Sequence, residues 1–175
     1  HLGCEPEAIA LSISGYGGAS LRQDLRLSDA GSAVFDDYGH HPAEIEATLH
    51  AFKSLGARRL LVAFQPHRYS RTHALLEQFG RCFYESDILL VTEIYAASEK
   101  PIPGVTGQRL TETIARHGHH QLHFCATLEK LLEELLAMVS EGDVVITLGA
   151  GNIWQVGEWL LEKLKSSPHQ VPVGG

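Results

Sequence analysis

Residues 60–72 read LLVAFQPHRYSRT. The apolar run over Leu60–Phe64 is typical of a strand that is buried on both faces of a sheet. Pro66 favours an extended conformation at Gln65, which ends the strand. A helical pattern follows, so the stretch predicts a strand, a polar turn and a helix. Open parallel sheets are built from such units, and their ligands bind beyond the carboxyl ends of the strands.

A second unit of this kind lies upstream. The polar sequence DDYGHHP over Asp36–Pro42 follows the apolar run Ala33–Phe35 and leads into a helical pattern over Pro42–Leu55. Because the carboxyl ends of parallel strands meet at one edge of a sheet, we expect the two polar turns to lie side by side. This placement predicts a ligand site at that edge.

The rest of the chain alternates between strand and helix patterns. Leu25–Leu27 and Ser32–Phe35 flank the turn-forming residues Ser28–Gly31, which predicts a β-hairpin. The fold class is therefore α/β, a three-layer Rossmann-like, mostly parallel sheet with an antiparallel edge hairpin. We expect further strands at 59–64, 87–92, 122–125 and 143–148, and further helices at 70–84, 106–117, 127–139 and 152–164.

The composition limits the class of protein. The 175 residues are 44% apolar, enough for one full domain with a core, and the net charge of −7 gives no general basic footprint for nucleic acid. No apolar run reaches the length of a membrane span, and no secretory signal pattern opens the chain. The cysteines Cys4, Cys82 and Cys125 fit neither a zinc spacing nor a disulfide framework, so we expect a reducing, cytoplasmic setting.

The ends of the chain suggest a piece of a longer protein. The first residue is His1 rather than Met, and a glycine-rich break follows a short helical pattern at Glu5–Ser14. We expect residues 1–20 to be the tail of an upstream domain and residues 21–165 to form the main domain. The Pro-containing segment 166–175 is expected to be disordered.

The turn after Phe64 predicts an anion site. Arg68 and Arg71 are three residues apart, which places them on one face of a starting helix, and His67 adds a third donor. Guanidinium groups beside the free N–H groups of a helix start bind carboxylate or phosphate. The alternative is a set of solvated polar residues paired with acids. Arginine near a helix N-terminus opposes the helix dipole, and that local conflict favours a function.

The turn after Phe35 carries a second candidate set. Asp36 and Asp37 can contact a ribose, a metal-bound water or an arginine, and Gly39 allows close approach of a ligand. His40 titrates near neutral pH and can donate to a carboxylate. The alternative is an ordinary helix N-cap region, which often contains Asp.

Two other patterns have stronger structural explanations. The sequence GAGNIW over Gly149–Trp154 follows a strand and opens a helix, but Trp154 replaces the third glycine of a dinucleotide fingerprint, so a tight turn is favoured. A rim contact through Asn152 stays open. Four histidines form no complete metal shell with Cys or acid, so a solvated loop is favoured: His117, His119, His120 and His123.

Five motifs together resemble, in order and spacing, the carboxyl-terminal domain of the Mur ligase family of peptidoglycan synthesis. They are Phe35–Pro42, Phe64–Thr72, Ile94–Ala97, Pro101–Gly104 and Gly149–Trp154. The likeness extends from about Leu21 to Leu164. Within the family, residues 65–72 resemble the member that joins L-alanine to UDP-N-acetylmuramate.

The resemblance implies an ATP-dependent amide ligase. ATP, with magnesium, phosphorylates the lactyl carboxylate of UDP-N-acetylmuramate, and the amine of L-alanine attacks the acyl phosphate. The carboxyl-terminal domain closes over a central ATPase domain. By motif match, Asp37 and Tyr38 lie at the nucleotide. The carboxylate of alanine or the charged intermediate is held by His40, His67, Arg68 and Arg71.

Departures from the family pattern accompany this resemblance. Leu21–Gln23 replaces the paired arginines that usually precede the hairpin, and Ser98 stands where glycine is usual. The sequence contains no G-x-x-x-x-G-K-[ST] phosphate loop, so we expect no turnover by this chain alone. The competing hypotheses are a stand-alone, non-catalytic domain that binds a nucleotide or an acidic metabolite, and a protein that binds metal through its histidines.

Overall fold

The computed structural model describes residues 26–27 and 32–166. Five parallel strands and one antiparallel edge strand form a single sheet in the order β1-β2-β6-β3-β4-β5. The strands are β1 (Arg26–Leu27), β2 (Ala33–Asp37), β3 (Leu60–Phe64), β4 (Ile88–Thr92), β5 (Leu122–Cys125) and β6 (Val144–Leu148). The predicted mostly parallel α/β sheet is confirmed.

Several predictions made from the sequence lie outside the described residues. The short strand β1 pairs antiparallel with β2, but the turn Ser28–Gly31 of the predicted hairpin is not described. The predicted helix Glu5–Ser14, the stretch Leu21–Gln23 and the tail beyond residue 166 also lie outside, as does the predicted domain boundary at residue 20. Ser166 itself, predicted to begin the tail, is the last residue of a helix.

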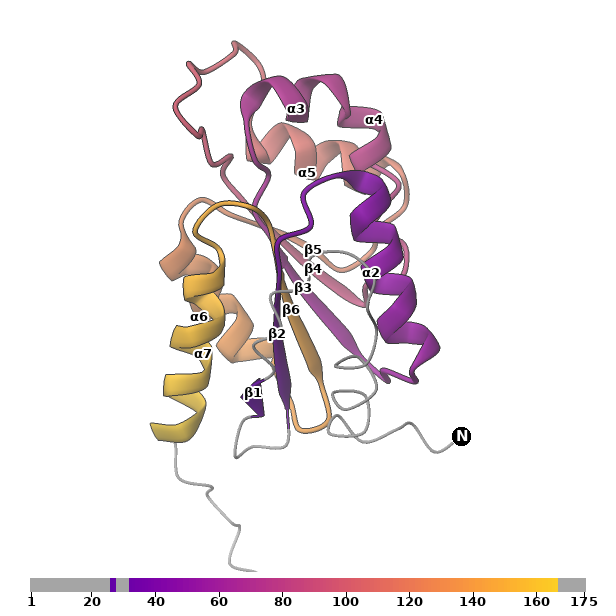
Figure 1. Ribbon diagram of the computed structural model, residues 1–175, viewed down its shortest axis with the longest axis vertical. Coiled ribbons are helices and arrows are strands. Elements are labelled where there is room, and N and C mark those ends of the chain that lie inside the picture. Colours follow the sequence, from indigo (N-terminus) through magenta and orange to yellow (C-terminus); the bar gives the residue numbers. More distant parts are fainter. Residues whose placement is uncertain (1–25, 28–31, 167–175) are drawn as a thin grey trace, which may run out of the picture.

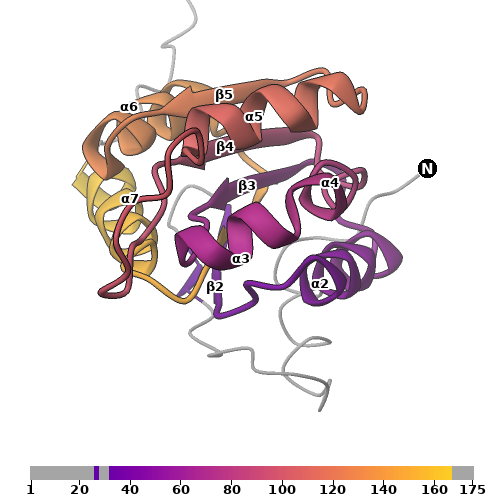
Figure 2. The same ribbon diagram turned by 90° about the horizontal axis from the view of Figure 1, so that it is seen from above.

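The helices cover both faces of the sheet, which makes the three predicted layers (Figures 1 and 2). One face carries α2 (Pro42–Ser54), α3 (Tyr69–Ala74), α4 (Leu76–Phe79) and α5 (Gly107–Arg116). The other carries α6 (Leu128–Met138) and α7 (Trp154–Ser166). Thr106 and Thr127 cap α5 and α6 through their hydroxyl groups. Within the described part of the chain, no helix combines the length and apolarity that crossing a bilayer requires.

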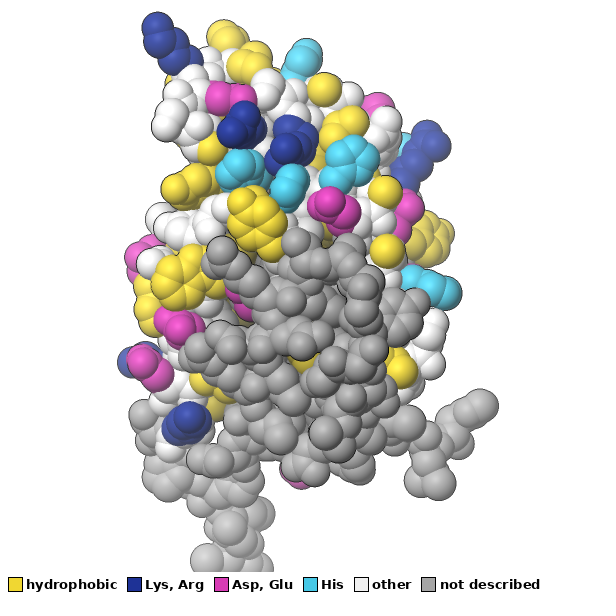
Figure 3. All heavy atoms as spheres, viewed as in Figure 1, with side chains coloured by type: hydrophobic (Ala, Val, Ile, Leu, Met, Phe, Trp, Pro, Cys, Tyr) yellow, Lys and Arg dark blue, Asp and Glu magenta, His cyan; other side chains and the backbone are white. Residues whose placement is uncertain are grey.

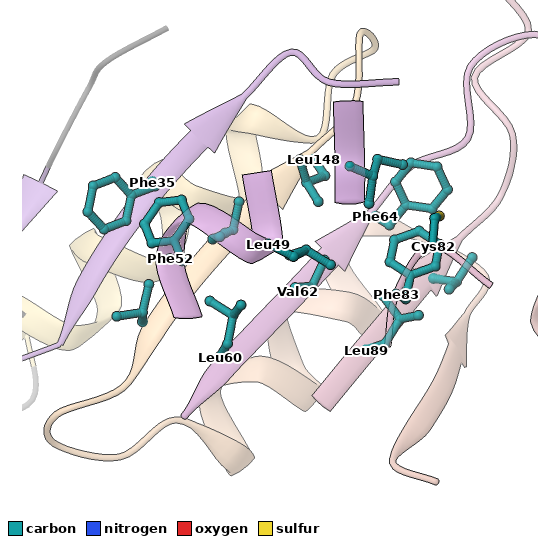
Figure 4. Close-up of a cluster of buried hydrophobic side chains, with 14 of the residues drawn as sticks. Phe35, Leu49, Phe52, Leu60, Val62, Phe64, Cys82, Phe83, Leu89 and Leu148 are labelled. Carbon is teal, nitrogen blue, oxygen red and sulfur yellow. The ribbon is translucent and has the colours of Figure 1, made fainter. Parts of the chain in front are cut away.

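The core consists of two apolar layers separated by the sheet. Along β3, Leu60, Val62 and Phe64 face α2, whereas Leu61 and Ala63 face α6 and α7, as the alternation of a strand requires. Figure 4 shows the first layer, in which Phe35 of β2 packs against Phe52 of α2 and, further along, Phe64 of β3 packs against Phe83. Burying each large apolar side chain stabilises the fold by about 1.5–3 kcal/mol. The two layers therefore hold the strands in place within the sheet.

The single helix predicted over residues 70–84 is wrong. The chain makes two short helices, α3 and α4, separated at Leu75, whose φ of −111° and ψ of 16° leave the helical region. Residues 80–84 form turns, yet Phe79 and Phe83 are buried against Phe64. The helical spacing of these apolar residues indicated burial correctly, but the change of direction at Leu75 brings them into the core.

The strand order creates a topological switch point at the carboxyl edge of the sheet, where open α/β sheets have their ligand-binding crevice. β6 lies between β2 and β3. The chain leaves β2 and β3 toward α2 and α3 on one face, whereas it leaves β6 toward α7 on the opposite face. Adjacent strands whose connections diverge to opposite faces form the usual ligand-binding position of an open α/β sheet. The two polar clusters predicted from the sequence follow β2 and β3, and therefore lie at this position.

Candidate ligand site at the carboxyl edge of the sheet

The turn after β2 is held by Asp37. Its side chain is only 2% exposed. The carboxylate accepts hydrogen bonds from the Gly39 N–H at 2.9 Å and from the Thr48 hydroxyl at 2.5 Å. Burial raises the pKa of Asp37, although both donors oppose that shift. The carboxyl group therefore points into the protein and stabilises the turn that presents Tyr38 and His40.

The helix that follows this turn is capped by His41 rather than by an aspartate. The His41 ring accepts from the Ala43 N–H, and Glu44 accepts from the N–H groups of His40 and His41 at 3.0 Å each. This reciprocal arrangement is a capping box. The alternative interpretation of Asp36 and Asp37 as N-cap residues is therefore wrong, because the cap lies four residues beyond Asp37. Asp36 instead accepts a hydrogen bond from Thr147.

The turn after β3 holds Arg68 in an unusual backbone conformation. Its φ is 72° and its ψ is 135°, a region that non-glycine residues rarely occupy and that costs about 1–3 kcal/mol. The Arg68 N–H donates to the Tyr95 carbonyl at 2.8 Å, and the Arg68 carbonyl accepts from the N–H and the hydroxyl of buried Thr72. These bonds offset the strain and leave the side chain of Arg68 exposed at the start of α3.

His67 lies at the centre of the cluster. Its ring stacks on Tyr95, with centroids 5.7 Å apart, and lies 5.8 Å from the ring of His40. Nη1 of Arg71 is 3.4 Å from Nδ1 of His67, and because a guanidinium can only donate, the imidazole nitrogen accepts. Burial lowers the pKa of His67, and the nearby charge of Arg71 lowers it further. Both effects favour the neutral ring, which accepts the bond that orients Arg71.

The floor of the crevice is formed by Gln65 and the glycine-rich turn after β6. The Gln65 amide donates to the Asn152 side chain and accepts from the Asn152 N–H, both at 2.9 Å. A Cβ at Gly151 would lie 2.3 Å from Gln65 Oε1 and 2.7 Å from the Tyr95 ring, so only glycine fits there. These close approaches agree with the tight-turn interpretation of Gly149–Trp154, and Asn152 is bonded to Gln65.

The structure brings most of the predicted residues together. Figure 3 shows histidine and Lys or Arg side chains gathered near the end of the molecule where α3 lies in Figure 1. His40, His67 and Arg71 form one continuous set of contacts, and Arg68 lies beside them at the N-cap of α3. The ring of Tyr38, 40% exposed, contacts the edge of His40. Of the predicted residues, Asp37 alone turns its functional group away from solvent.

The histidines after α5 are separated from this edge and have other partners. Nε2 of His117 lies 3.0 Å from Glu77, and Nε2 of His119 lies 2.8 Å from the Ser86 hydroxyl. Among residues 26–27 and 32–166, no group of three or more His, Cys, Asp or Glu side chains is arranged to hold a metal ion. The arrangement of the described residues gives the metal-binding hypothesis no support.

Three contributors to the site were not identified from the sequence. Gln65 and Tyr95 lie within the motifs but were given no role of their own, and Glu99 lies between two motifs. Glu99 accepts from the N–H and the hydroxyl of Ser70, at 3.0 and 2.6 Å. Pro66 was the one signal of these contacts in the sequence. It has no N–H to donate to a neighbouring strand, so pairing within the sheet stops at the end of β3. The residues around it pair instead with Tyr95.

Comparison with known proteins defines the class to which this fold and site belong. Residues 22–151 match the family described as "Mur ligase, glutamate ligase domain", and the chain belongs to that family. Two similar proteins are both called UDP-N-acetylmuramate–L-alanine ligase. The one from Syntrophobacter fumaroxidans is 64% identical over 86% of this chain and 32% of its own length. The one from Solibacter usitatus is 48% identical over 95% of this chain and 35% of its own length.

A solved structure agrees with these relatives. The UDP-N-acetylmuramate–alanine ligase of Thermotoga maritima superposes with a TM-score of 0.69 and 27% identity. The match covers 91% of this chain and 36% of that chain. The present chain therefore spans about a third of the length of the ligases it resembles. It corresponds to the carboxyl-terminal part that the sequence motifs indicated.

Proposed function

We propose that this chain is the carboxyl-terminal, amino-acid-binding domain of an ATP-dependent ligase that joins L-alanine to UDP-N-acetylmuramate. The observation that carries the proposal is the cluster of His40, His67 and Arg71, with Arg68 beside it, at the crevice where β6 separates β2 from β3. Two guanidinium groups at a helix start suit a carboxylate, which Arg binds through paired hydrogen bonds. L-alanine presents such a carboxylate, and the acyl phosphate presents an anion of similar size.

The contact with His67 gives the two arginines different roles. Because His67 accepts from Arg71, the Arg71 guanidinium is oriented before a ligand arrives, which lowers the entropy cost of binding. Arg68 is exposed and supplies the second, adaptable donor. With the carboxylate held, the amine of alanine is positioned for attack on the activated lactyl carbon.

The nucleotide would lie against the turn after β2. Tyr38 presents an exposed ring that can pack on a base or ribose, whereas the buried Asp37 carboxylate supports that turn from within. We therefore assign Tyr38 a direct contact with ATP and Asp37 an indirect one. The phosphate loop and the magnesium site, for which this sequence has no motif, are assigned to the remainder of the full-length ligase. Closure of this domain over that remainder would exclude water from the acyl phosphate.

The test is kinetic and uses the full-length ligase. We expect the double substitution Arg68→Ala/Arg71→Ala to lower kcat/KM for L-alanine by the equivalent of about 2–5 kcal/mol, because a charged ligand group loses its paired donors. The readout is phosphate release that depends on ATP, L-alanine and UDP-N-acetylmuramate. Arg81→Ala, an exposed arginine in the turn after α4, is the matched control. Unchanged kinetics in the double variant would reject the proposal that Arg68 and Arg71 form a clamp for the carboxylate of the amino acid.

The alternative of a stand-alone, non-catalytic binding domain is less well supported. The family match and the relatives favour a ligase domain. The two proposals differ in a simple assay. A stand-alone domain would bind ATP or an acidic metabolite by itself in calorimetry, whereas a ligase domain would release phosphate only when joined to the rest of the enzyme.

A further inference from the structure

Backbone strain in the described part of the chain is concentrated beside the arginine clamp. The non-glycine residues with positive φ there are Arg68, Ala97 and Ser98, with φ of 72°, 47° and 71°. All three lie in two segments, the turn after β3 and the loop Ile94–Val105 after β4. Such conformations persist only where surrounding contacts hold them, and they are typical of functional sites. The contacts between these two segments therefore identify what holds the clamp in place.

Two sets of hydrogen bonds join the segments. Tyr95 donates from its N–H to the Pro66 carbonyl and accepts at its own carbonyl from the Arg68 N–H, both at 2.8 Å. Beyond this pair, the Glu99 N–H donates to the Ala96 carbonyl and closes a turn through the two left-handed residues. The loop after β4 lies beside α3 (Figures 1 and 2), and the Glu99 carboxylate accepts both Ser70 bonds at the start of that helix.

Glu99 takes the place of the missing cap of α3. Among the described residues, Arg68 at the N-cap makes no side-chain bond to the helix, and the first turn contains no acid. A carboxylate at a helix N-terminus satisfies free N–H groups and interacts favourably with the helix dipole. The two Ser70 bonds hold the pKa of Glu99 below its usual range, as expected of a carboxylate bound in its charged form.

We propose that Glu99 is a positioning residue for the clamp formed by Arg68 and Arg71. Glu99 caps α3 from the loop after β4 and thereby fixes the position of both arginines. Both arginines lie within one turn of the capped residue Ser70, so loss of the cap lets the start of α3 fray and the two guanidinium groups lose their common orientation. This inference rests on the proposed function. It adds that the loop Ile94–Val105 controls affinity for the amino acid.

The experiment uses the full-length ligase and separates binding of the amino acid from binding of the other substrates. We expect Glu99→Ala to raise the KM for L-alanine about tenfold, the effect of losing a helix cap. The KM values for ATP and UDP-N-acetylmuramate should change less than about twofold. Glu99→Gln, which keeps an acceptor for one Ser70 donor, should recover part of the loss. Glu133→Ala, an exposed glutamate on α6, is the control for surface charge.

A double-mutant cycle distinguishes failure of this inference from failure of the proposed function. If Glu99 acts through the arginines, adding Glu99→Ala to Arg68→Ala/Arg71→Ala causes little further loss, because contacts in one network are not additive. Wild-type kinetics of Glu99→Ala together with a strong defect in the double arginine variant would overturn the positioning role alone. Wild-type kinetics in the arginine variant would overturn the function. Equal effects of Glu99→Ala on all three KM values would indicate a general structural defect and also reject the inference.

Discussion

The hydrogen bonds of Gln65 make the sharpest prediction about stability. Gln65 is 6% exposed, and its amide is bonded at both ends to Asn152, on the turn after β6. Gln65→Ala leaves the Asn152 N–H and the Asn152 side-chain oxygen without these partners. Each buried polar group left unpaired costs about 1–3 kcal/mol. Because Asn152 is half-buried and water can replace part of the loss, we expect a total of about 2–3 kcal/mol.

Urea unfolding followed by far-UV circular dichroism would measure this loss. At about 2–4 °C per kcal/mol for a domain of this size, the thermal midpoint should fall by about 4–12 °C. Asn152→Ala, which keeps the bond from its backbone N–H to Gln65, should cost roughly half as much. Gln108→Ala, at an exposed position of α5, should stay within about 0.5 kcal/mol of the parent. A loss at Gln65 no larger than that at Gln108 would refute the bonded floor of the crevice.

Other predictions test the site and the core. Asp37→Ala should destabilise the chain by about 1–3 kcal/mol in urea unfolding, whereas Asp37→Asn, which can still bond both partners, should cost less; equal losses would contradict the bonded turn. Gly107→Ala should lower the thermal midpoint, because its Cβ would lie 2.4 Å from the Thr92 carbonyl oxygen; an unchanged midpoint would disprove the close approach. Burial raises the pKa of the Cys82 thiol, and that of Cys125 to about 11, so both should react with a thiol reagent only in urea. Fast reaction of a Cys4→Ser variant in native buffer would contradict their burial. The lowered pKa of His67 means that the unfolded chain binds a proton more readily, so its contribution to stability is present above the ordinary histidine pKa and is lost as the pH falls. Between about pH 7 and pH 5, His67→Gln should therefore lose less stability than the parent, and equal losses would show that His67 is not responsible.

The strands and their order along the chain could be predicted because burial on both faces leaves a local signal. Each of the parallel strands β3, β4 and β6 is a run of apolar residues that ends in polar or glycine-rich sequence. The helices predicted to begin at Thr106 and Thr127 do begin there, each with the threonine as its cap, because a cap and its helix are adjacent in sequence. Local chemistry therefore predicted the fold class and the end of the sheet at which the polar residues of the candidate site gather.

The position of β6 could not be predicted in this way. Its apolar run resembles that of β3, and nothing within either strand says which two neighbours it will have. In the structure β6 lies between β2 and β3, so the two polar clusters follow the strands on either side of β6. The break at Leu75 was missed for a related reason. The spacing of apolar residues is compatible with one helix, and the core selects two.

The roles of side chains with the same charge also depend on contacts distant in sequence. Asp36 and Asp37 are adjacent acids, yet as neighbours in a strand they point to opposite faces of the sheet. Asp36 meets Thr147 of β6, whereas Asp37 meets Thr48 of α2. From the sequence alone, both Asp36 and Asp37 were candidates for contact with a ligand. Tyr38 and His40 lie beyond the end of the strand, where the His40 ring contacts the rings of Tyr38 and His67.

The loop after β4 and the turn that carries Arg68 both contain strained backbone and are joined by hydrogen bonds. Ser98 has a φ of 71°, a left-handed conformation that glycine adopts freely and that is strained for a residue with a side chain. Arg68 likewise keeps a positive φ, of 72°, although it carries a side chain. Strain at both positions is maintained by the same contacts, the Tyr95 backbone pair and the Glu99 cap. The loop and the arginine turn therefore form one unit, in which neither segment would keep its conformation if the other moved away.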